Sequence, residues 1–273
     1  MEIIQTRIKF LALLLITSVA SYAQTIIEGI CYKFDSKKLE ATIISSNNVP
    51  KSQKSSIDIP SEVKYENITY KVTTIASEAF RYRTDITSIN IPNSVLYIGS
   101  GAFMECTNLS SITLPNTITR IEPKTFWLCS NLVSITIPEG VKTISDYAFN
   151  NCDALTSIVL PSTIEHISSG AFDETNPLKS VTVNSPTPIT IYSNTFMVFG
   201  ELHVPAGSKE AYSKAPIWKN FTIIEDTETE TTGIAQLSSI TQQPTSVFNL
   251  SGQSLTAPRK GLNIINGKKV IVK

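Results

Sequence analysis

Three cysteines recur at one fixed interval and are the residues of this chain best suited to chemistry. Cys106, Cys129 and Cys152 lie 23 residues apart, and thiolates are ligands that select zinc or copper. Each cysteine follows a phenylalanine by three residues, so we expect the thiols to face the core, where cysteine is among the most often buried residue types. Arg83 and Thr175 fill the same position in the outer repeats. The position therefore does not require sulfur, and the pattern favours a row of inert thiols over a metal site.

The sequence contains no other residue pattern typical of catalysis. Its two histidines, His166 and His203, have no neighbours spaced as in a catalytic triad or a zinc motif. The phosphate-binding glycine loops, the nucleophile elbow and the HExxH zinc motif do not occur in it. Acidic residues are too scattered to nominate a pair for glycoside hydrolysis. We therefore expect a protein that is not an enzyme and that uses no cofactor and no metal.

The elements that must position these residues repeat with the same period. Phenylalanine, isoleucine and proline each return every 23 residues, in the series Phe80, Phe103, Phe126, Phe149 and Phe172; Ile75, Ile98, Ile121, Ile144 and Ile167; and Pro92, Pro115, Pro138 and Pro161. Each unit reads I-x-x-x-A-F-x-x-C-x-x-L-x-S-I-x-L-P-x-x-V-x-x-I. The alternation in L-x-S-I-x-L predicts a half-buried strand, and V-x-x-I predicts a second, shorter extended segment. A serine or aspartate three residues before most of the phenylalanines predicts the cap of a single helical turn.

A unit of this size cannot bury its own apolar face, so the copies must stack into a solenoid whose short strands pair in parallel. The A-F-x-x-C turn, the S-I-x-L-P strand and the 23-residue step resemble the BspA-like, or Treponema-type, leucine-rich repeats of bacterial surface proteins. The resemblance runs from about Ile57 to Val183. It implies a leucine-rich repeat solenoid of short parallel β-strands and single helical turns, in a protein that is exported and adhesive.

The ends of the chain predict further segments. Arg7 and Lys9 precede an apolar run that ends before a small-residue cleavage site, so residues 1–23 read as a signal peptide. Residues 24–56 are expected to cap the front of the repeats, which occupy 57–200. Residues 201–225 are expected to cap the back, with Trp218 and Phe221 covering the last coil; this segment also resembles the terminal cap of the BspA-like family. No later segment is long and apolar enough to span a membrane.

An acidic, threonine-rich stretch near the C-terminus predicts a linker over residues 226–240, followed by a β tail over 241–273. Asn266-Gly267 between two apolar runs predicts a hairpin in this tail. The tail resembles the C-terminal sorting domain of the type IX secretion route of Bacteroidetes. The alternative is a small β module that has no role in sorting.

The outward positions of the repeats are the candidate binding surface. Lys plus Arg and Asp plus Glu both number 23, a balance that argues against nucleic acid and anionic membranes as partners. Regular rows of serine and threonine along the main strands are expected to reflect limited space between strands, although they could also bind extended protein or glycan chains. Specificity is expected where the copies differ, and the candidate residues are Tyr97, Arg120, His166, Met104 and Trp127. Trp127 could serve as an exposed anchor or pack between coils.

Taken together, these patterns predict a secreted or outer-membrane-attached cell-surface protein. The resemblance implies adhesion through protein–protein interaction, with a host surface, the extracellular matrix or a neighbouring cell as the partner. Two alternatives remain at this stage: a carbohydrate-binding protein that captures glycans, and a structural component of the cell envelope.

Overall fold

The computed structural model describes residues 24–45, 55–175 and 178–226, together with the backbone of four short strands in the C-terminal region. The chain divides into two compact units, residues 1–225 and 226–273. The predicted signal peptide, residues 1–23, and most of the predicted linker, 226–240, lie outside the described residues.

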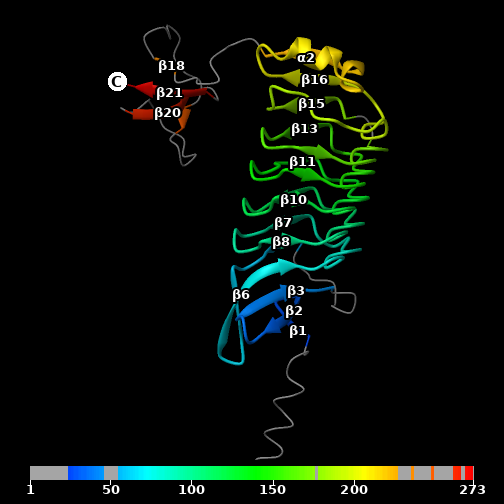
Figure 1. Cartoon of the computed structure of the whole chain (residues 1–273). Helices are drawn as coiled ribbons and strands as arrows, with labels where there is room; N and C mark the ends of the chain where they lie inside the picture. Colours follow the sequence, from blue (N-terminus) through cyan, green and yellow to red (C-terminus); the bar gives the residue numbers. More distant parts are fainter. Residues whose placement is uncertain are drawn as a thin grey trace, which may run out of the picture. The chain divides into compact units, whose positions relative to one another are not determined.

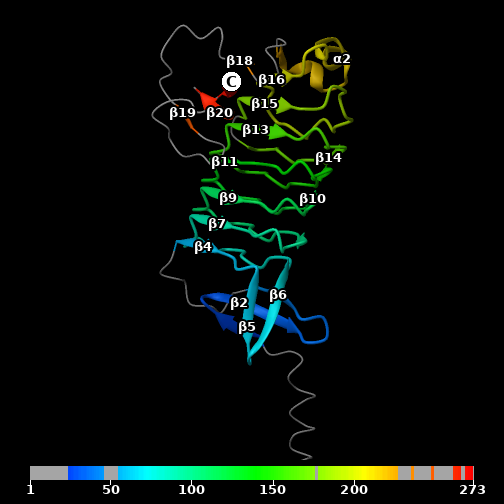
Figure 2. The same ribbon diagram turned by 90° about the vertical axis from the view of Figure 1, so that its left-hand side faces the viewer.

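The first unit is a solenoid whose coils lie one above another between β3 and β16 (Figure 1). Each coil contributes one main strand to one side of the stack, seen for β4, β7 and β9 in Figure 2. The main strands are β4 (Ser56–Asp58), β7 (Ser88–Asn90), β9 (Ser111–Thr113), β11 (Ser134–Ile135), β13 (Ser157–Leu160), β15 (Ser180–Val183), β16 (Glu201–Val204) and β17 (Thr222–Glu225). They pair in parallel, and the solenoid with 23-residue repeats that the sequence predicts is confirmed.

The main strands form two separate sheets. Their orders are β11-β9-β7-β4 and β13-β15-β16-β17. In the first sheet Ser88 and Ser134 both lie opposite Ser111, so equivalent residues of successive coils stand in one row. The ladder of main strands is interrupted between β11 and β13, the one junction within the repeats at which this sheet ends and the next begins.

A second set of strands lies on another side of the stack and consists of β8 (Tyr97–Ile98), β10 (Arg120–Ile121), β12 (Thr143–Ile144) and β14 (His166–Ile167). β10, β12 and β14 form one parallel sheet, and Figure 2 shows β10 and β14 across the stack from the main strands. In each strand the isoleucine is buried and the residue before it faces outward. This second ladder runs past the junction at which the first is interrupted.

The turns that carry the phenylalanines differ from the predicted helical turns. Gly101 has a φ of 62°, which ends an α-helix at once. Alternate N–H groups bond to the next coil instead, Gly101 to the carbonyl oxygen of Pro123 at 2.9 Å and Phe103 to that of Thr125 at 3.0 Å. The hydroxyl of Ser100, a predicted cap, also donates to Pro123 at 2.8 Å. Stacking between coils therefore supplies the hydrogen bonds that a local helix would have made.

A stack of phenylalanine rings runs through the core. The rings of successive coils lie nearly parallel, with centroids 5.2–5.6 Å apart from Phe80 to Phe196. At the back, Trp218 and Phe221 lie 5.9 and 5.2 Å from the ring of Phe196 and are themselves buried. The prediction that these two residues cover the last coil is confirmed. They belong to or follow η2 (Trp218–Asn220), which comes after α2 (Lys209–Lys214).

The front of the stack is closed by a sheet in the order β1-β2-β3-β6-β5. Its strands are β1 (Thr25–Ile27), β2 (Ile30–Asp35), β3 (Glu40–Ile43), β5 (Glu62–Tyr65) and β6 (Ile68–Ile75). β5 and β6 form a hairpin inserted after the first main strand, and β6 then pairs with β8. The cap therefore includes residues beyond the predicted boundary at 56, because the inserted hairpin adds its strands to the same sheet.

The second unit contains a four-stranded sheet in the order β18-β21-β20-β19. Its strands are β18 (Ala235–Gln236), β19 (Val247–Phe248), β20 (Gly261–Ile265) and β21 (Lys268–Val272). β20 and β21 are antiparallel with Ile265 opposite Lys268, so the predicted hairpin is confirmed, although Asn266 and Gly267 themselves lie outside the described residues. β18 pairs with β21 and extends the β module into the predicted linker.

Candidate interaction surfaces

The three repeated thiols are buried hydrogen-bond donors. Cys106, Cys129 and Cys152 are fully buried and not in disulfides. Each Sγ donates to the carbonyl oxygen of the phenylalanine in the preceding coil, at 3.0, 3.1 and 3.2 Å. Burial raises the pKa of all three thiols, to about 12 for Cys106. They are therefore protonated at neutral pH, whereas attack and metal binding need the thiolate. The prediction that these thiols face the core is confirmed.

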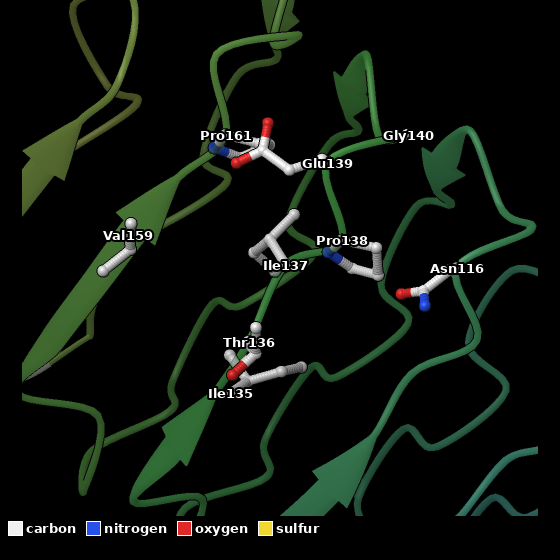
Figure 3. Close-up of a pocket in the computed structure, with 9 residues that line it drawn as sticks. All are labelled: Asn116, Ile135, Thr136, Ile137, Pro138, Glu139, Gly140, Val159 and Pro161. Atoms are coloured by element: carbon white, nitrogen blue, oxygen red, sulfur yellow. The ribbon is translucent and has the colours of Figure 1, made fainter. Parts of the chain in front are cut away.

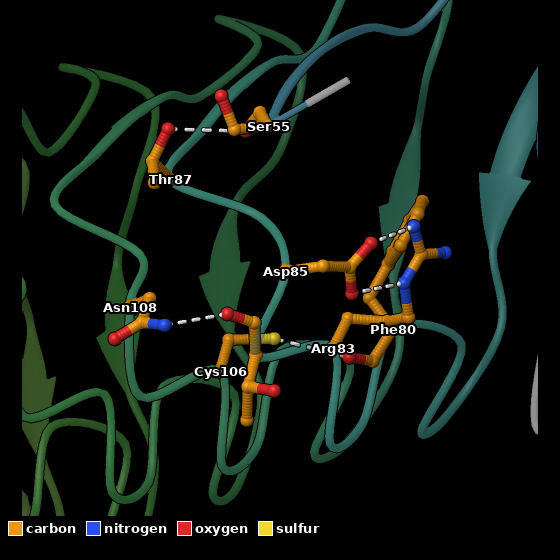
Figure 4. Close-up of polar contacts among 8 residues, drawn as sticks. Ser55, Phe80, Arg83, Asp85, Thr87, Cys106 and Asn108 are labelled. Carbon is orange, nitrogen blue, oxygen red and sulfur yellow. Dashed lines mark hydrogen bonds and ion pairs between the residues drawn. The ribbon is translucent and has the colours of Figure 1, made fainter. Parts of the chain in front are cut away.

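The same position is filled differently at the two ends of the cysteine row. Thr175 donates its hydroxyl to the carbonyl oxygen of Phe149 at 2.6 Å, so a threonine makes the bond that a cysteine makes elsewhere. At the front, Arg83 forms two hydrogen bonds of 2.8 Å with Asp85 (Figure 4). In the described part of the chain, no three His, Cys, Asp or Glu side chains lie close enough to hold a metal ion.

Three of the five predicted binding residues lie on one surface, which we call the second-strand face and define by the outward residues of β8, β10, β12 and β14. Arg120 lies opposite Thr143, and Thr143 lies opposite His166. Tyr97 occupies the equivalent position in β8, one coil earlier, and is 46% exposed. The ring of His166 contacts that of Tyr192 edge-on, with centroids 6.0 Å apart.

The second-strand face has an exposed apolar corner at its front end. Leu96 is 57% exposed and stands next to Tyr97. Both line a small hollow of about 120 Å³ that also contacts Arg120 and Glu122. Arg120 is exposed and takes part in none of the ion pairs among the described residues. The corner thus combines two apolar side chains with a cation that is available to a partner.

Met104 and Trp127 lie on the turns instead. Met104 is only 4% exposed and therefore offers a partner little surface. Trp127 is half-buried between coils: its Nε1 donates to Oδ1 of Asn150 at 2.8 Å. The Lys124 ammonium lies 5.1 Å from the centre of the Trp127 ring. The alternative that Trp127 packs between coils fits these contacts.

A larger groove opens on the main-strand side, where the ladder is interrupted. We call it the β11–β13 groove; its volume is about 690 Å³. The lining residues come from three successive coils and are Asn116, Ile135, Thr136, Ile137, Pro138, Glu139, Gly140, Val159 and Pro161. In Figure 3, Ile137 and Pro138 lie between Val159 on one coil and Asn116 on another, with the Glu139 carboxylate next to Pro161.

This groove contains none of the binding residues predicted from the sequence. Its sequence signals are two departures from the repeat: Gly140 replaces the serine or threonine of other coils, such as Thr117 and Thr163, and Val159 replaces the threonine of its row. Val159 is 50% exposed. Neither departure reveals that β11 and β13 are unpaired, and that separation is what opens the groove.

The repeats match a known family. Residues 73–200 match, in six copies, the family described as BspA type Leucine rich repeat region. This segment is therefore similar to the BspA-type repeats. No curated protein matches the sequence. No helix among the described residues has the length and apolar character needed to cross a bilayer.

Solved bacterial leucine-rich repeat proteins share the fold. The T. pallidum leucine-rich repeat protein TpLRR is 23% identical, with a TM-score of 0.50 over 72% of this chain and 93% of that one. A leucine-rich repeat protein from Bacteroides ovatus is 18% identical, with a TM-score of 0.50 over 78% of this chain and 70% of that one. At these identities the similarity establishes the leucine-rich repeat solenoid fold alone, and the ligand must be argued from the surface.

Proposed function

We propose that this chain is an exported surface protein whose BspA-type repeats bind another protein, on a host or a neighbouring cell. Solenoid repeats present extended surfaces that are typically used for binding. The repeated cysteines, which are the residues best suited to chemistry, lie in the core, where their thiols donate to carbonyl oxygens of adjacent coils. The side chains that remain exposed on the solenoid are suited to binding a partner and do not require catalysis.

The exposed corner of the second-strand face is the observation that carries this proposal. Leu96 and Tyr97 are large apolar side chains left 57% and 46% exposed, and Arg120 lines the same hollow. Tyrosine and arginine are enriched among the residues that dominate protein–protein binding energies. The other end of the face is polar, with Lys142 and Glu165 paired at 2.7 Å, so the corner is the part best suited to anchor a partner.

Binding of extracellular matrix proteins and of glycans, measured in parallel with the full chain, tests the function. Tyr97→Ala should weaken binding of a protein ligand by about 2 kcal/mol, or roughly 30-fold, as expected for a hot-spot tyrosine. Tyr147→Ala is the matched control, since Tyr147 is 39% exposed but lies on a turn. Glycan binding alone, or equal losses in both variants, would overturn the proposal.

Export and attachment are separate parts of the proposal. They are supported by the order of charge, apolar run and small residues in 1–23, and by the resemblance of the β tail to a type IX sorting domain. Mass spectrometry of the protein released from its native cell surface tests both. We expect a mature N-terminus at Gln24 and loss of the tail. An intact residue range 241–273 on surface protein would contradict cleavage of a sorting signal.

A further inference from the structure

We propose that the β11–β13 groove binds an extended polypeptide segment in which an aliphatic side chain lies beside a lysine or arginine. The inference rests on the proposed function in one respect, that the partner is a protein. It concerns a different surface, because the groove lies on the main-strand side and shares no residue with the corner formed by Leu96, Tyr97 and Arg120.

The groove is a consequence of how two coils meet. In a regular parallel ladder each strand covers the edge of its neighbour at about 4.8 Å, which leaves no room between them. β11 and β13 belong to different sheets. No ladder of backbone hydrogen bonds therefore holds the ends of these two strands, or the prolines that follow them, together. Gly140 has no side chain where the coils on either side carry Thr117 and Thr163, and a Cβ there would lie 3.3 Å from the carbonyl oxygens of Asn116 and Ile118.

The floor of the groove is aliphatic. Ile135 and Ile137 line it from the core side and are only 9% and 5% exposed, so Val159, 50% exposed, offers most of the apolar surface. Two prolines and a half-exposed valine suit an aliphatic side chain, which gains free energy in proportion to the apolar area it buries. None of the nine lining residues is aromatic, so a sugar ring would find no flat apolar platform. The lining therefore favours a peptide over a glycan.

The polar groups of the groove specify the rest of the ligand. Glu139 is the one ionisable residue in the lining. Its Oε2 accepts hydrogen bonds from the backbone N–H and the hydroxyl of Ser162, at 3.3 and 3.1 Å, which hold the carboxylate at the rim. A cation on the partner would complement this charge. The amide of Asn116 and the hydroxyl of Thr136 are then available to the peptide backbone.

Backbone NMR titration of the full chain with three capped tripeptides tests the proposal: acetyl-Val-Lys-Val-amide, acetyl-Val-Gln-Val-amide and acetyl-Val-Glu-Val-amide. We expect the lysine peptide to shift the amides of Thr136, Ile137, Glu139, Gly140 and Val159. It should bind about two- to fivefold more tightly than the glutamine peptide, the range for an exposed ion pair. The glutamate peptide should bind most weakly. Equal binding of all three, no binding, or shifts confined to other residues would each overturn the proposal.

Two variants assign the effect to the groove. Glu139→Gln should abolish the preference for the lysine peptide over the glutamine peptide. Val159→Thr, which restores the residue type of its row, should weaken all three peptides. An undiminished lysine preference in Glu139→Gln would refute the role of the carboxylate. The corner variant Tyr97→Ala separates this proposal from the previous one: if it loses the protein ligand while the tripeptides never bind, the proposed function stands and the groove proposal fails.

Discussion

Replacement of Phe126 by alanine is the sharpest test of the phenylalanine stack. Phe126 is fully buried, with the rings of Phe103 and Phe149 at 5.6 and 5.2 Å and inclined to it by 8° and 14°. Removing a buried phenylalanine costs about 3–5 kcal/mol through lost transfer energy and the cavity left behind. Because two stacked pairs are lost as well, we expect Phe126→Ala to reach the upper end of that range.

Phe80 provides the comparison, because it has only one stacked neighbour among the described phenylalanines. Its ring lies 5.5 Å from that of Phe103, and it is as deeply buried as Phe126. An aromatic pair contributes about 0.5–1.5 kcal/mol beyond the area it buries. Phe126→Ala should therefore destabilise the fold by about 1 kcal/mol more than Phe80→Ala.

Urea unfolding and thermal melting, each followed by circular dichroism, measure the loss of stability in the two variants. For a domain of this size each kcal/mol lowers Tm by about 2–4 °C, so Phe126→Ala should melt roughly 8–20 °C below the parent chain. Val133→Ala, at a position 57% exposed, should change stability by less than about 0.5 kcal/mol and serves as the control. If Phe80→Ala costs as much as Phe126→Ala, or more, the number of stacked neighbours does not set the stability of a coil.

Three further predictions concern the thiols and the glycines. Cys129→Thr should be tolerated within about 1 kcal/mol, because Thr175 makes the equivalent bond, whereas Cys129→Ala should cost about 1–2 kcal/mol more; equal losses in urea unfolding would show that the bond is unimportant. Burial raises the pKa of the three ladder thiols, to about 12 for Cys106, so the folded chain keeps protons that the unfolded chain loses above about pH 8.5. The free energy of unfolding should therefore be independent of these thiols below that pH and fall above it by up to roughly 4 kcal/mol per pH unit, and a flat profile between pH 8 and 10 would contradict this account. Gly99→Ala should cost about 3 kcal/mol, since its Cβ would lie 2.4 Å from the backbone nitrogen of Ser77, while Gly207→Ala should cost about 1 kcal/mol, from its φ of 78° alone; thermal melts that rank the two in the opposite order would refute the difference.

Much of the fold was predictable because the residue types that recur every 23 positions are those whose side chains must be buried. The 23-residue recurrence of phenylalanine and isoleucine matches the stacked rings and the paired second strands. The turns were not predictable in the same way. A serine three residues before a phenylalanine is a good helix cap in isolation, but at Ser100 the hydroxyl and the following N–H both bond to Pro123 in the next coil. Contacts between copies override local preference, and a single unit does not show them.

The candidate surfaces were partly predictable for a related reason. Tyr97 and Arg120 stand before buried isoleucines in short strands, so the alternation of the strand places them outside. Met104 follows a phenylalanine in a turn, where no such alternation applies, and its side chain is buried. The β11–β13 groove depends on the spacing of two strands, to which the identities of Gly140 and Val159 give only a partial guide.

The stacking of interchangeable coils also fixes how this protein can vary. Each coil bonds to the one before and the one after, so a whole unit can be gained or lost without disturbing the hydrogen bonds of the rest. The corner and the groove share the coil that carries Asn116 and Arg120, so no whole unit lies between them and their separation is fixed. A duplication or deletion of 23 residues outside the segment 96–161 would instead lengthen or shorten the stack by about 4.8 Å while leaving both contacts intact.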